Sequence, residues 1–137
     1  MSYKQIYNAL SGNFDLVQSD LGGSPGGIGS FIWVEGTADM TIESFTGIVV
    51  NKPLSTLQIV LPTSARFGDW FRILGHSNDG WKLAVNPGQK IFYGLNETST
   101  NTGYIEAIHS RASIEFICIS ENVGYSIISA VGTVDVL

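Results

Sequence analysis

The sequence predicts an all-β domain, an antiparallel β-sandwich or barrel of the jelly-roll kind that follows a short irregular N-terminal segment. Short apolar stretches rich in Ile, Val, Tyr, Phe and Trp recur along most of the 137 residues. Turn-forming Gly, Asn, Asp and Pro separate these stretches at intervals of about eight to twelve residues, as in β-sandwiches and barrels. No segment keeps the 3.6-residue apolar period of a helix for more than about two turns.

The N-terminal part, residues 1–46, is expected to be an irregular docking segment. It contains a weak helical spacing of Ile6, Leu10 and Phe14 and the glycine-rich loop LGGSPGGIGS at residues 21–30. Glycine and proline at that density favour neither helix nor strand. A strand is expected at residues 31–34 and a less distinct one within 37–47. If the helical spacing forms a true helix, the fold class becomes α+β instead.

The remainder, residues 47–137, is expected to be the antiparallel β module. Leu57, Ile59 and Leu61 are spaced two residues apart and therefore lie on one face of the segment 56–61, which indicates a strand with one buried face. The predicted strands are residues 48–50, 56–61, 70–74, 81–85, 91–93, 104–108, 113–119, 124–131 and 133–136.

Composition favours self-association and argues against nucleic acid and membranes as partners. Apolar residues make up 44% of the chain and charged residues only 14%, against about 25% charged in an average soluble domain. Since large exposed apolar patches are rare on monomers, we expect several copies to bury them together. The net charge is −5, and no cluster of basic residues is present to neutralise phosphates. Apolar runs fall far short of the roughly 20 residues needed to cross a bilayer.

Cys118 and two histidines are the candidates for nucleophilic chemistry. Cys118 shares a strand face with Ile114 and Phe116, which predicts a small core residue rather than a reactive thiol. His76 falls in a turn and His109 at a strand end, with no fixed spacing to each other. Cys118 is the only cysteine, so no disulfide within the chain can form. The opening residues lack the apolar core of a secretory signal, so synthesis in a cytoplasm is expected.

No other motif predicts catalysis, a metal or a cofactor. The glycine-rich loop runs into a strand, whereas phosphate-binding loops lead into a helix. Ligand spacing typical of zinc or calcium sites is missing from the sequence. Four acidic residues could meet in space as a carboxylate pair, which leaves a carbohydrate-active enzyme as a minor alternative; they are Asp69, Asp79, Glu106 and Glu115. We therefore expect a protein that is not an enzyme.

Aromatic side chains are the best candidates for contact with a partner or a glycan. Aromatic rings bury a large area and often carry a polar group, so they serve both cores and interfaces. Within residues 70–74, Trp70, Arg72 and Leu74 alternate with Phe71 and Ile73, so one of these two faces should be core and the other a contact surface. The candidate interface or glycan-contact residues are Trp33, Trp70, Arg72, Trp81, Tyr93 and Tyr104.

An ordered set of turn and strand residues in the second part resembles a β module that recurs in tail fibres and other virion surface proteins of tailed bacteriophages. The matching positions are Leu61-Pro62, Gly68-Asp69, Gly80-Trp81, Asn86, Gly88-Gln89, Ile91, Gly94, Cys118 and Ser129 to Gly132. Glycine and Asp suit turns, and Gln89 can satisfy backbone groups at one. These are scaffold positions, so the resemblance implies a fold and a setting but no catalytic residue.

The resemblance implies a non-catalytic structural or attachment component of a virion that acts as a symmetric oligomer, since such modules are commonly homotrimers. A capsid decoration protein, a head fibre and a short tail-fibre tip all fit a chain of this length. The expected partners are further copies of the chain, other virion proteins and a host-surface glycan. The alternative is a lectin-like adhesin, in which exposed rings stack on sugars beside loop groups such as Asn78, Asp79 and Asn101.

Overall fold

The computed structural model describes residues 30–76, 80–107 and 110–137. The chain divides into two units, Met1–Phe31 and Ile32–Leu137, and every strand below belongs to the second. The helical spacing from Ile6 to Phe14 and the glycine-rich loop up to Gly29 lie outside the described residues, so the expected docking segment and the α+β alternative stay predictions.

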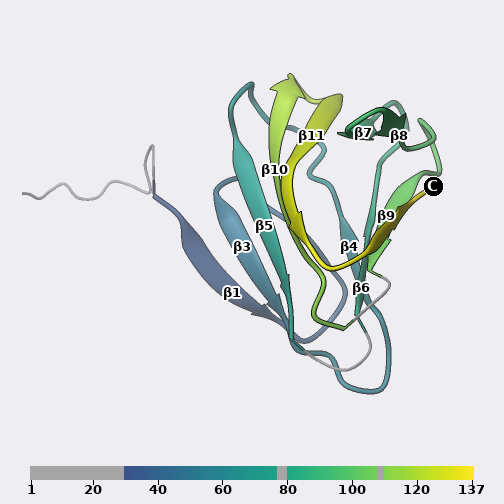
Figure 1. Ribbon diagram of the computed structural model, residues 1–137. Coiled ribbons are helices and arrows are strands. Elements are labelled where there is room, and N and C mark those ends of the chain that lie inside the picture. Colours follow the sequence, from purple (N-terminus) through teal and green to yellow (C-terminus); the bar gives the residue numbers. More distant parts are fainter. Residues whose placement is uncertain (1–29, 77–79, 108–109) are drawn as a thin grey trace, which may run out of the picture. The chain divides into compact units, whose positions relative to one another are not determined.

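The described residues form strands and turns and no helix, which confirms the all-β prediction (Figure 1). No helix among these residues is therefore long and apolar enough to cross a bilayer. The strands are β1 (Ile32–Gly36), β2 (Met40–Thr41), β3 (Thr46–Val50), β4 (Leu57–Val60), β5 (Trp70–Gly75), β6 (Trp81–Ala84), β7 (Lys90–Tyr93), β8 (Asn96–Glu97), β9 (Tyr104–Ala107), β10 (Ser113–Ser120), β11 (Gly124–Val131) and β12 (Val134–Val136).

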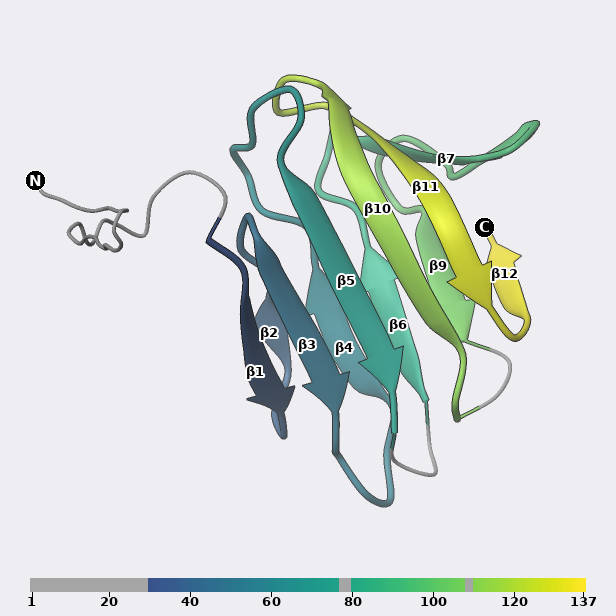
Figure 2. The same ribbon diagram turned by 60° about the vertical axis from the view of Figure 1, so that its left-hand side comes forward.

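Two sheets face each other across an apolar core, as in a β-sandwich (Figure 2). The seven-stranded sheet has the order β1-β3-β5-β10-β11-β7-β8, and the five-stranded sheet has the order β12-β9-β6-β4-β2. Side chains alternate between the core and solvent along the strands, so residues Phe71 and Ile73 of β5 are buried. Trp70, Arg72 and Leu74 consequently lie on the outer face, which answers the question that the sequence left open.

The sheets are mixed, and the prediction of purely antiparallel sheets is wrong. β1, β3 and β5 run parallel in one sheet, and β2, β4 and β6 run parallel in the other. The chain alternates between the two sheets from β1 to β6, so each crossing returns it beside the previous strand in the same direction. Antiparallel pairing joins β5 to β10 and β10 to β11, and also β6 to β9 and β9 to β12. Alternation of apolar residues reports burial, and it is the same for either strand direction.

The β unit begins earlier than the boundary expected between residues 46 and 47. β1 pairs with β3, with Ile32 opposite Thr46, and β2 pairs with β4, with Met40 opposite Ile59. Gly36 is the last residue of β1 and is buried. A Cβ atom added there would lie 2.7 Å from the Leu57 side chain and 2.8 Å from the Ile48 side chain. The segment that looked irregular therefore supplies the first strand of each sheet.

Aromatic rings fill the centre of the core. The rings of Phe71 and Phe116 stack with their centroids 4.8 Å apart, and Tyr125 meets Phe71 edge-on at 5.9 Å. Burial raises the pKa of the Tyr125 hydroxyl far above its usual value. Trp81 is completely buried, and its Nε1–H donates a hydrogen bond to the carbonyl oxygen of Ala112 at 2.7 Å.

Cys118 belongs to the same core, as the sequence predicts. Its side chain is completely buried, and burial raises the pKa of its thiol. The Sγ atom lies 3.4 Å from the carbonyl oxygen of Ser120 and 3.8 Å from that of Ala65. A buried thiol held in its neutral form is a poor nucleophile.

Several residues of the virion-protein resemblance hold loops together. Gln89 is buried; its Oε1 accepts a hydrogen bond from the backbone N–H of Asn86 at 2.9 Å. Its Nε2 donates to the carbonyl oxygens of Pro62 at 2.8 Å and Asn122 at 3.1 Å. One amide side chain thus ties three loops to one another, which explains why a glutamine suits this position.

Candidate functional site

The structure separates the six candidate contact residues that the sequence suggests. Trp33, Trp70 and Arg72 lie on the outer face of the seven-stranded sheet. Tyr104 lies on β9 of the five-stranded sheet, and Tyr93 lies at the end of β7, near the opposite edge of the larger sheet from β1. We assign the remaining residue, Trp81, to the core instead of a contact surface, because its side chain is completely buried and hydrogen-bonded there.

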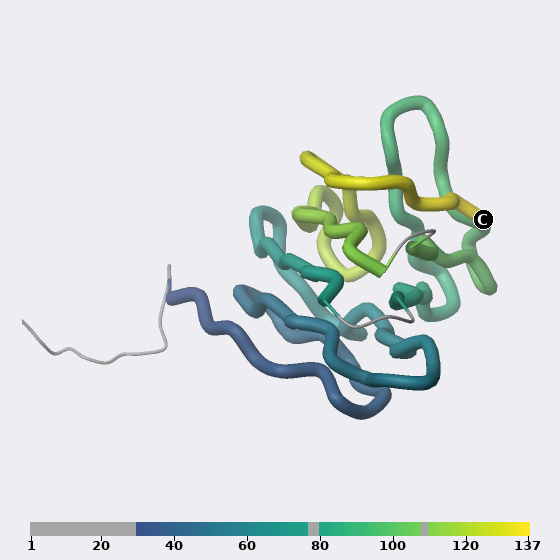
Figure 3. Tube along the Cα trace, turned by 60° about the horizontal axis from the view of Figure 1, so that its bottom comes forward, coloured from purple at the N-terminus to yellow at the C-terminus, as the bar shows by residue number. Residues whose placement is uncertain are grey.

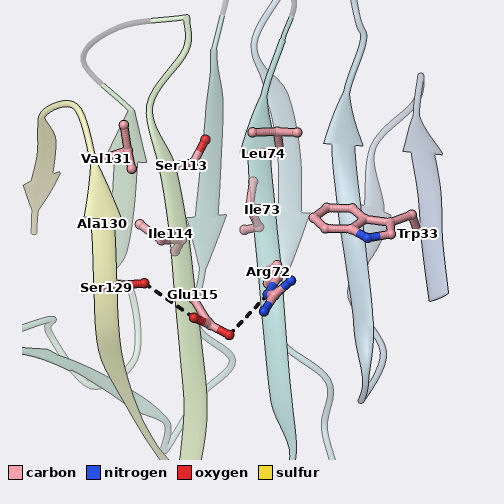
Figure 4. Close-up of a pocket in the computed structure, with 10 residues that line it drawn as sticks. All are labelled: Trp33, Arg72, Ile73, Leu74, Ser113, Ile114, Glu115, Ser129, Ala130 and Val131. Carbon is pink, nitrogen blue, oxygen red and sulfur yellow. Dashed lines mark hydrogen bonds and ion pairs between the residues drawn. The ribbon is translucent and has the colours of Figure 1, made fainter. Parts of the chain in front are cut away.

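A shallow depression of about 190 Å³ lies on the outer face of the seven-stranded sheet (Figure 4). We call it the outer-face depression; its lining residues are Trp33, Arg72, Ile73, Leu74, Ser113, Ile114, Glu115, Ser129, Ala130 and Val131. Large apolar side chains are exposed around it: Trp33 at 47%, Leu74 at 43% and Val131 at 69%. Most of its accessible surface is therefore apolar.

Gly47 determines how the Trp33 side chain lies at one side of this depression. A Cβ atom at residue 47 would come within 2.5 Å of the Trp33 ring. Because glycine has no side chain, the indole ring from β1 can lie against the neighbouring strand β3, and it extends toward β5 (Figure 4). The glycine thereby creates a flat aromatic surface on the face of the sheet.

A row of polar side chains crosses the depression, and its members bond to one another. The Nε of Arg72 donates to an oxygen of Glu115 at 3.1 Å, and the hydroxyl of Ser129 donates to the other oxygen at 3.4 Å (Figure 4). The Arg72 guanidinium also lies 4.7 Å from the centre of the Trp70 ring, within cation–π range. Both oxygens of the carboxylate are thus occupied inside the chain.

A β-bulge brings Ser129 to this position. Phe116 pairs with Ile127, but Glu115 pairs with Ser129, so Ile128 is an extra residue in β11. Regular pairing would place Ile128 beside Glu115 and turn Ser129 toward the core. The bulge instead puts Ser129 on the outer face and Ala130 opposite Ile114. Bulges commonly redirect side chains in this way.

A second hollow, of about 510 Å³, lies between the β7–β8 hairpin and the C-terminal strand β12. We call it the hairpin cleft; its lining residues are Tyr93, Gly94, Leu95, Asn96, Gly132, Thr133, Val134 and Val136. None of these residues carries a charge. Leu95, at the tip of the hairpin, is fully exposed.

The remaining candidates lie apart from these hollows. Tyr104 lies beside Lys82 on the five-stranded sheet, and the Lys82 Nζ is 3.8 Å from the centre of the Tyr104 ring. Asp69 accepts hydrogen bonds from the Ser44 hydroxyl at 2.7 Å and the Arg66 N–H at 3.1 Å, so it organises a loop. Within the described ranges, no three His, Cys, Asp or Glu side chains are grouped closely enough to hold a metal ion.

The acidic and histidine candidates are not brought together in the part of the chain that is described. Glu106 lies on β9 of the smaller sheet, whereas Glu115 lies on β10 of the larger one. Asp79 and His109 lie outside the described residues, and His76 is exposed just after β5.

The geometry defines a mixed two-sheet β-sandwich with an apolar outer face and an uncharged cleft at one edge. No model of a known protein family matches the chain, and no curated protein is similar to it. The function must therefore be argued from the outer-face depression and the hairpin cleft.

Ser129 and Val131 line the outer-face depression but are not among the contact residues that the sequence suggests. The bulge in β11 breaks the alternation of inner and outer residues, so the sequence could not show which face of the sheet they lie on.

Proposed function

We propose that the chain is a non-catalytic structural or attachment component of a bacteriophage virion that works as a symmetric homo-oligomer, a trimer. The observation that carries this proposal is the apolar outer face of the seven-stranded sheet, where Trp33, Leu74 and Val131 are exposed around one depression. A second copy of the chain is the occupant that best fits this surface.

The polar groups of the outer-face depression favour a protein partner over a small polar ligand. Arg72, Glu115 and Ser129 already bond to one another. Burying a charge is costly when it loses its partners, and much less so when the partner is buried with it. The row can therefore be covered without leaving a carboxylate unpaired, while the surrounding apolar side chains leave water.

The low charge content of the chain supports the same conclusion. Charged residues make up 14% of the sequence and apolar residues 44%. Interface centres are depleted in charged residues and enriched in aromatic residues and Arg, as this face is. Association would remove Trp33 and its neighbours from water.

The virion setting and the threefold symmetry derive from the resemblance described above. The contacts of Gln89 with Asn86, Pro62 and Asn122 give that motif a structural role, which agrees with a scaffold module. The candidate chemical groups also serve the scaffold: Cys118 is buried and Glu115 is held by Arg72. A capsid decoration protein, a head fibre and a fibre tip remain the components that fit.

Light scattering coupled to size exclusion tests the association. We expect the purified chain to be a trimer, and we expect Leu74→Glu to produce monomers because it places an unpaired charge inside the interface. Leu54→Glu is the matched control, since Leu54 is an exposed leucine in the loop before β4 and does not line the depression. A wild-type monomer, or a Leu74→Glu trimer, would refute the proposed interface.

The virion setting has a separate test. An antibody against the chain should label phage particles by electron microscopy and should detect the chain in purified particles. Particles without the chain would remove this part of the proposal and leave the association unaffected.

A further inference from the structure

Hydrogen bonds and one ion pair link the segments that form the walls of the hairpin cleft. Lys90 pairs with Glu97 at 2.5 Å across the hairpin, and the buried Thr98 hydroxyl accepts a hydrogen bond from the N–H of Ile91 at 3.0 Å. The N–H of Ser99 donates to the carbonyl oxygen of Leu137 at 3.2 Å, which links the hairpin to the C-terminal strand. The hairpin stands out from the sandwich beside the C-terminus (Figure 3).

The walls of the cleft combine one aromatic ring with apolar side chains. Tyr93, Val134 and Val136 are partly buried and pack against the core, so each has a fixed position with one side toward the cleft. Leu95 forms the outer lip, where Gly94 with φ of 61° turns the chain. Left-handed backbone of this kind suits glycine.

The polar groups of the cleft differ from those of the outer-face depression. The Tyr93 hydroxyl, the Asn96 amide and the Thr133 hydroxyl make no side-chain hydrogen bond with any of the residues that the structure describes. In the depression, by contrast, the polar side chains of Arg72 and Glu115 bond to each other. Polar groups that are available beside an apolar wall are what a small ligand rich in hydroxyls requires.

We propose that the hairpin cleft binds one ring of a neutral sugar. The apolar C–H face of a pyranose would lie against Tyr93 and the valines, while its hydroxyls pair with the Asn96 amide and the Thr133 hydroxyl. A hollow of about 510 Å³ accommodates a sugar ring. Since no lining residue is charged and the chain carries −5, anionic sugars such as sialic acid or sulfated glycans are disfavoured.

This site extends the attachment role proposed above, since a sugar on a host surface would be its source. The cleft lies within a single chain, so binding itself does not require the trimer. The sequence indicated Tyr93 as a contact residue. It did not single out Asn96, which falls in a polar loop, or Thr133, which begins a predicted strand.

Saturation-transfer NMR on the full chain tests the site, with methyl glycosides of glucose, galactose, mannose and N-acetylglucosamine as probes. At least one should receive saturation, and sialic acid should not. Asn96→Ala and Thr133→Ala should each weaken binding about tenfold, the effect of losing one hydrogen bond of about 1.4 kcal/mol. Thr63→Ala, an exposed threonine outside the cleft, is the matched control and should bind as the wild type does.

Each outcome decides for or against the cleft. If none of the four glycosides binds, or if both cleft variants bind as tightly as the wild type, the inference is refuted. Circular dichroism spectra identical to wild type show that the variants fold, and both altered side chains are exposed. The oligomeric state of the wild-type chain separates the two proposals. A wild-type monomer that binds sugar supports the cleft and refutes the trimer, whereas a wild-type trimer that binds no sugar refutes only the cleft. Leu74→Glu monomers should bind sugar as the wild type does, because the cleft lies within one chain.

Discussion

Replacing Trp81 by Phe should destabilise the fold strongly, and replacing Trp70 by Phe should not. Both residues begin a strand, and both are candidate contact residues in the sequence analysis. The structure places Trp81 wholly in the core, whereas Trp70 is half-buried on the outer face. The pair therefore tests the arrangement of the sheets directly.

The expected cost of Trp81→Phe has two parts. The substitution removes the 2.7 Å hydrogen bond from Nε1–H to the Ala112 carbonyl, which contributes about 1 kcal/mol to the free energy of unfolding. That carbonyl keeps a second donor, the N–H of Gly75 at 3.1 Å, so no buried acceptor is left without a partner. The smaller ring also leaves out about three buried heavy atoms, at about 0.8 kcal/mol each. The total is about 3 kcal/mol.

Urea unfolding monitored by circular dichroism measures this difference. At a slope of about 1.5 kcal/mol per molar urea, the Trp81→Phe midpoint should fall by about 2 M. Trp70→Phe should lose about 1 kcal/mol or less, because the ring is partly solvated and contacts Arg72 at the surface. Equal losses for the two variants would show that the assignment of inner and outer faces is incorrect.

Two further perturbations test the interior. Because burial raises the pKa of Tyr125 above the usual 10.0, the unfolded chain loses this proton first as the pH rises. The unfolded state then binds fewer protons than the folded state, so the free energy of unfolding should decrease above pH 10 by up to about 1.4 kcal/mol per pH unit. In urea titrations, Tyr125→Phe should make this decrease with pH smaller. If the free energy of unfolding of the variant falls with pH as steeply as that of the wild type, the prediction is wrong. Gly75→Ala should cost at least about 3 kcal/mol by thermal unfolding, because its Cβ would lie 2.6 Å from the carbonyl oxygen of Ala112. Gly88 has a φ of 87° and open space around it, so Gly88→Ala should cost only about 1 to 2 kcal/mol. If Gly75→Ala and Gly88→Ala lower the free energy of unfolding equally, the close contact of the new Cβ at residue 75 is not the cause.

Burial along individual strands could be predicted well from the sequence, since alternation directly reports it. The strand at Gly124–Val131 matches its predicted range, and most others agree within two residues at either end. The direction and neighbours of each strand could not be predicted. A strand such as β3, with Ile48 and Val50 buried, has the same pattern whether its partner is parallel or antiparallel.

The candidate sites show a similar limit. The outer face of β5 could be reduced to two alternatives from Trp70, Arg72 and Leu74, and the structure decided between them. The link from Ser129 to Glu115 could not be foreseen, because it depends on one extra residue in β11. The hairpin cleft is formed by the β7–β8 hairpin and β12, which lie far apart in the sequence, so no local sequence pattern predicts it.

The alternation of the chain between the sheets from β1 to β6 constrains the order of assembly. None of these strands can pair with the one that directly follows it, so the early half cannot grow by adding hairpins. β5, the last of these strands to join the seven-stranded sheet, stays an open edge until β10 arrives, after the intervening strands β6 to β9. Long-range pairing of this kind slows folding. During synthesis the emerging chain would present an uncovered sheet edge, which makes this stage the one most exposed to aggregation.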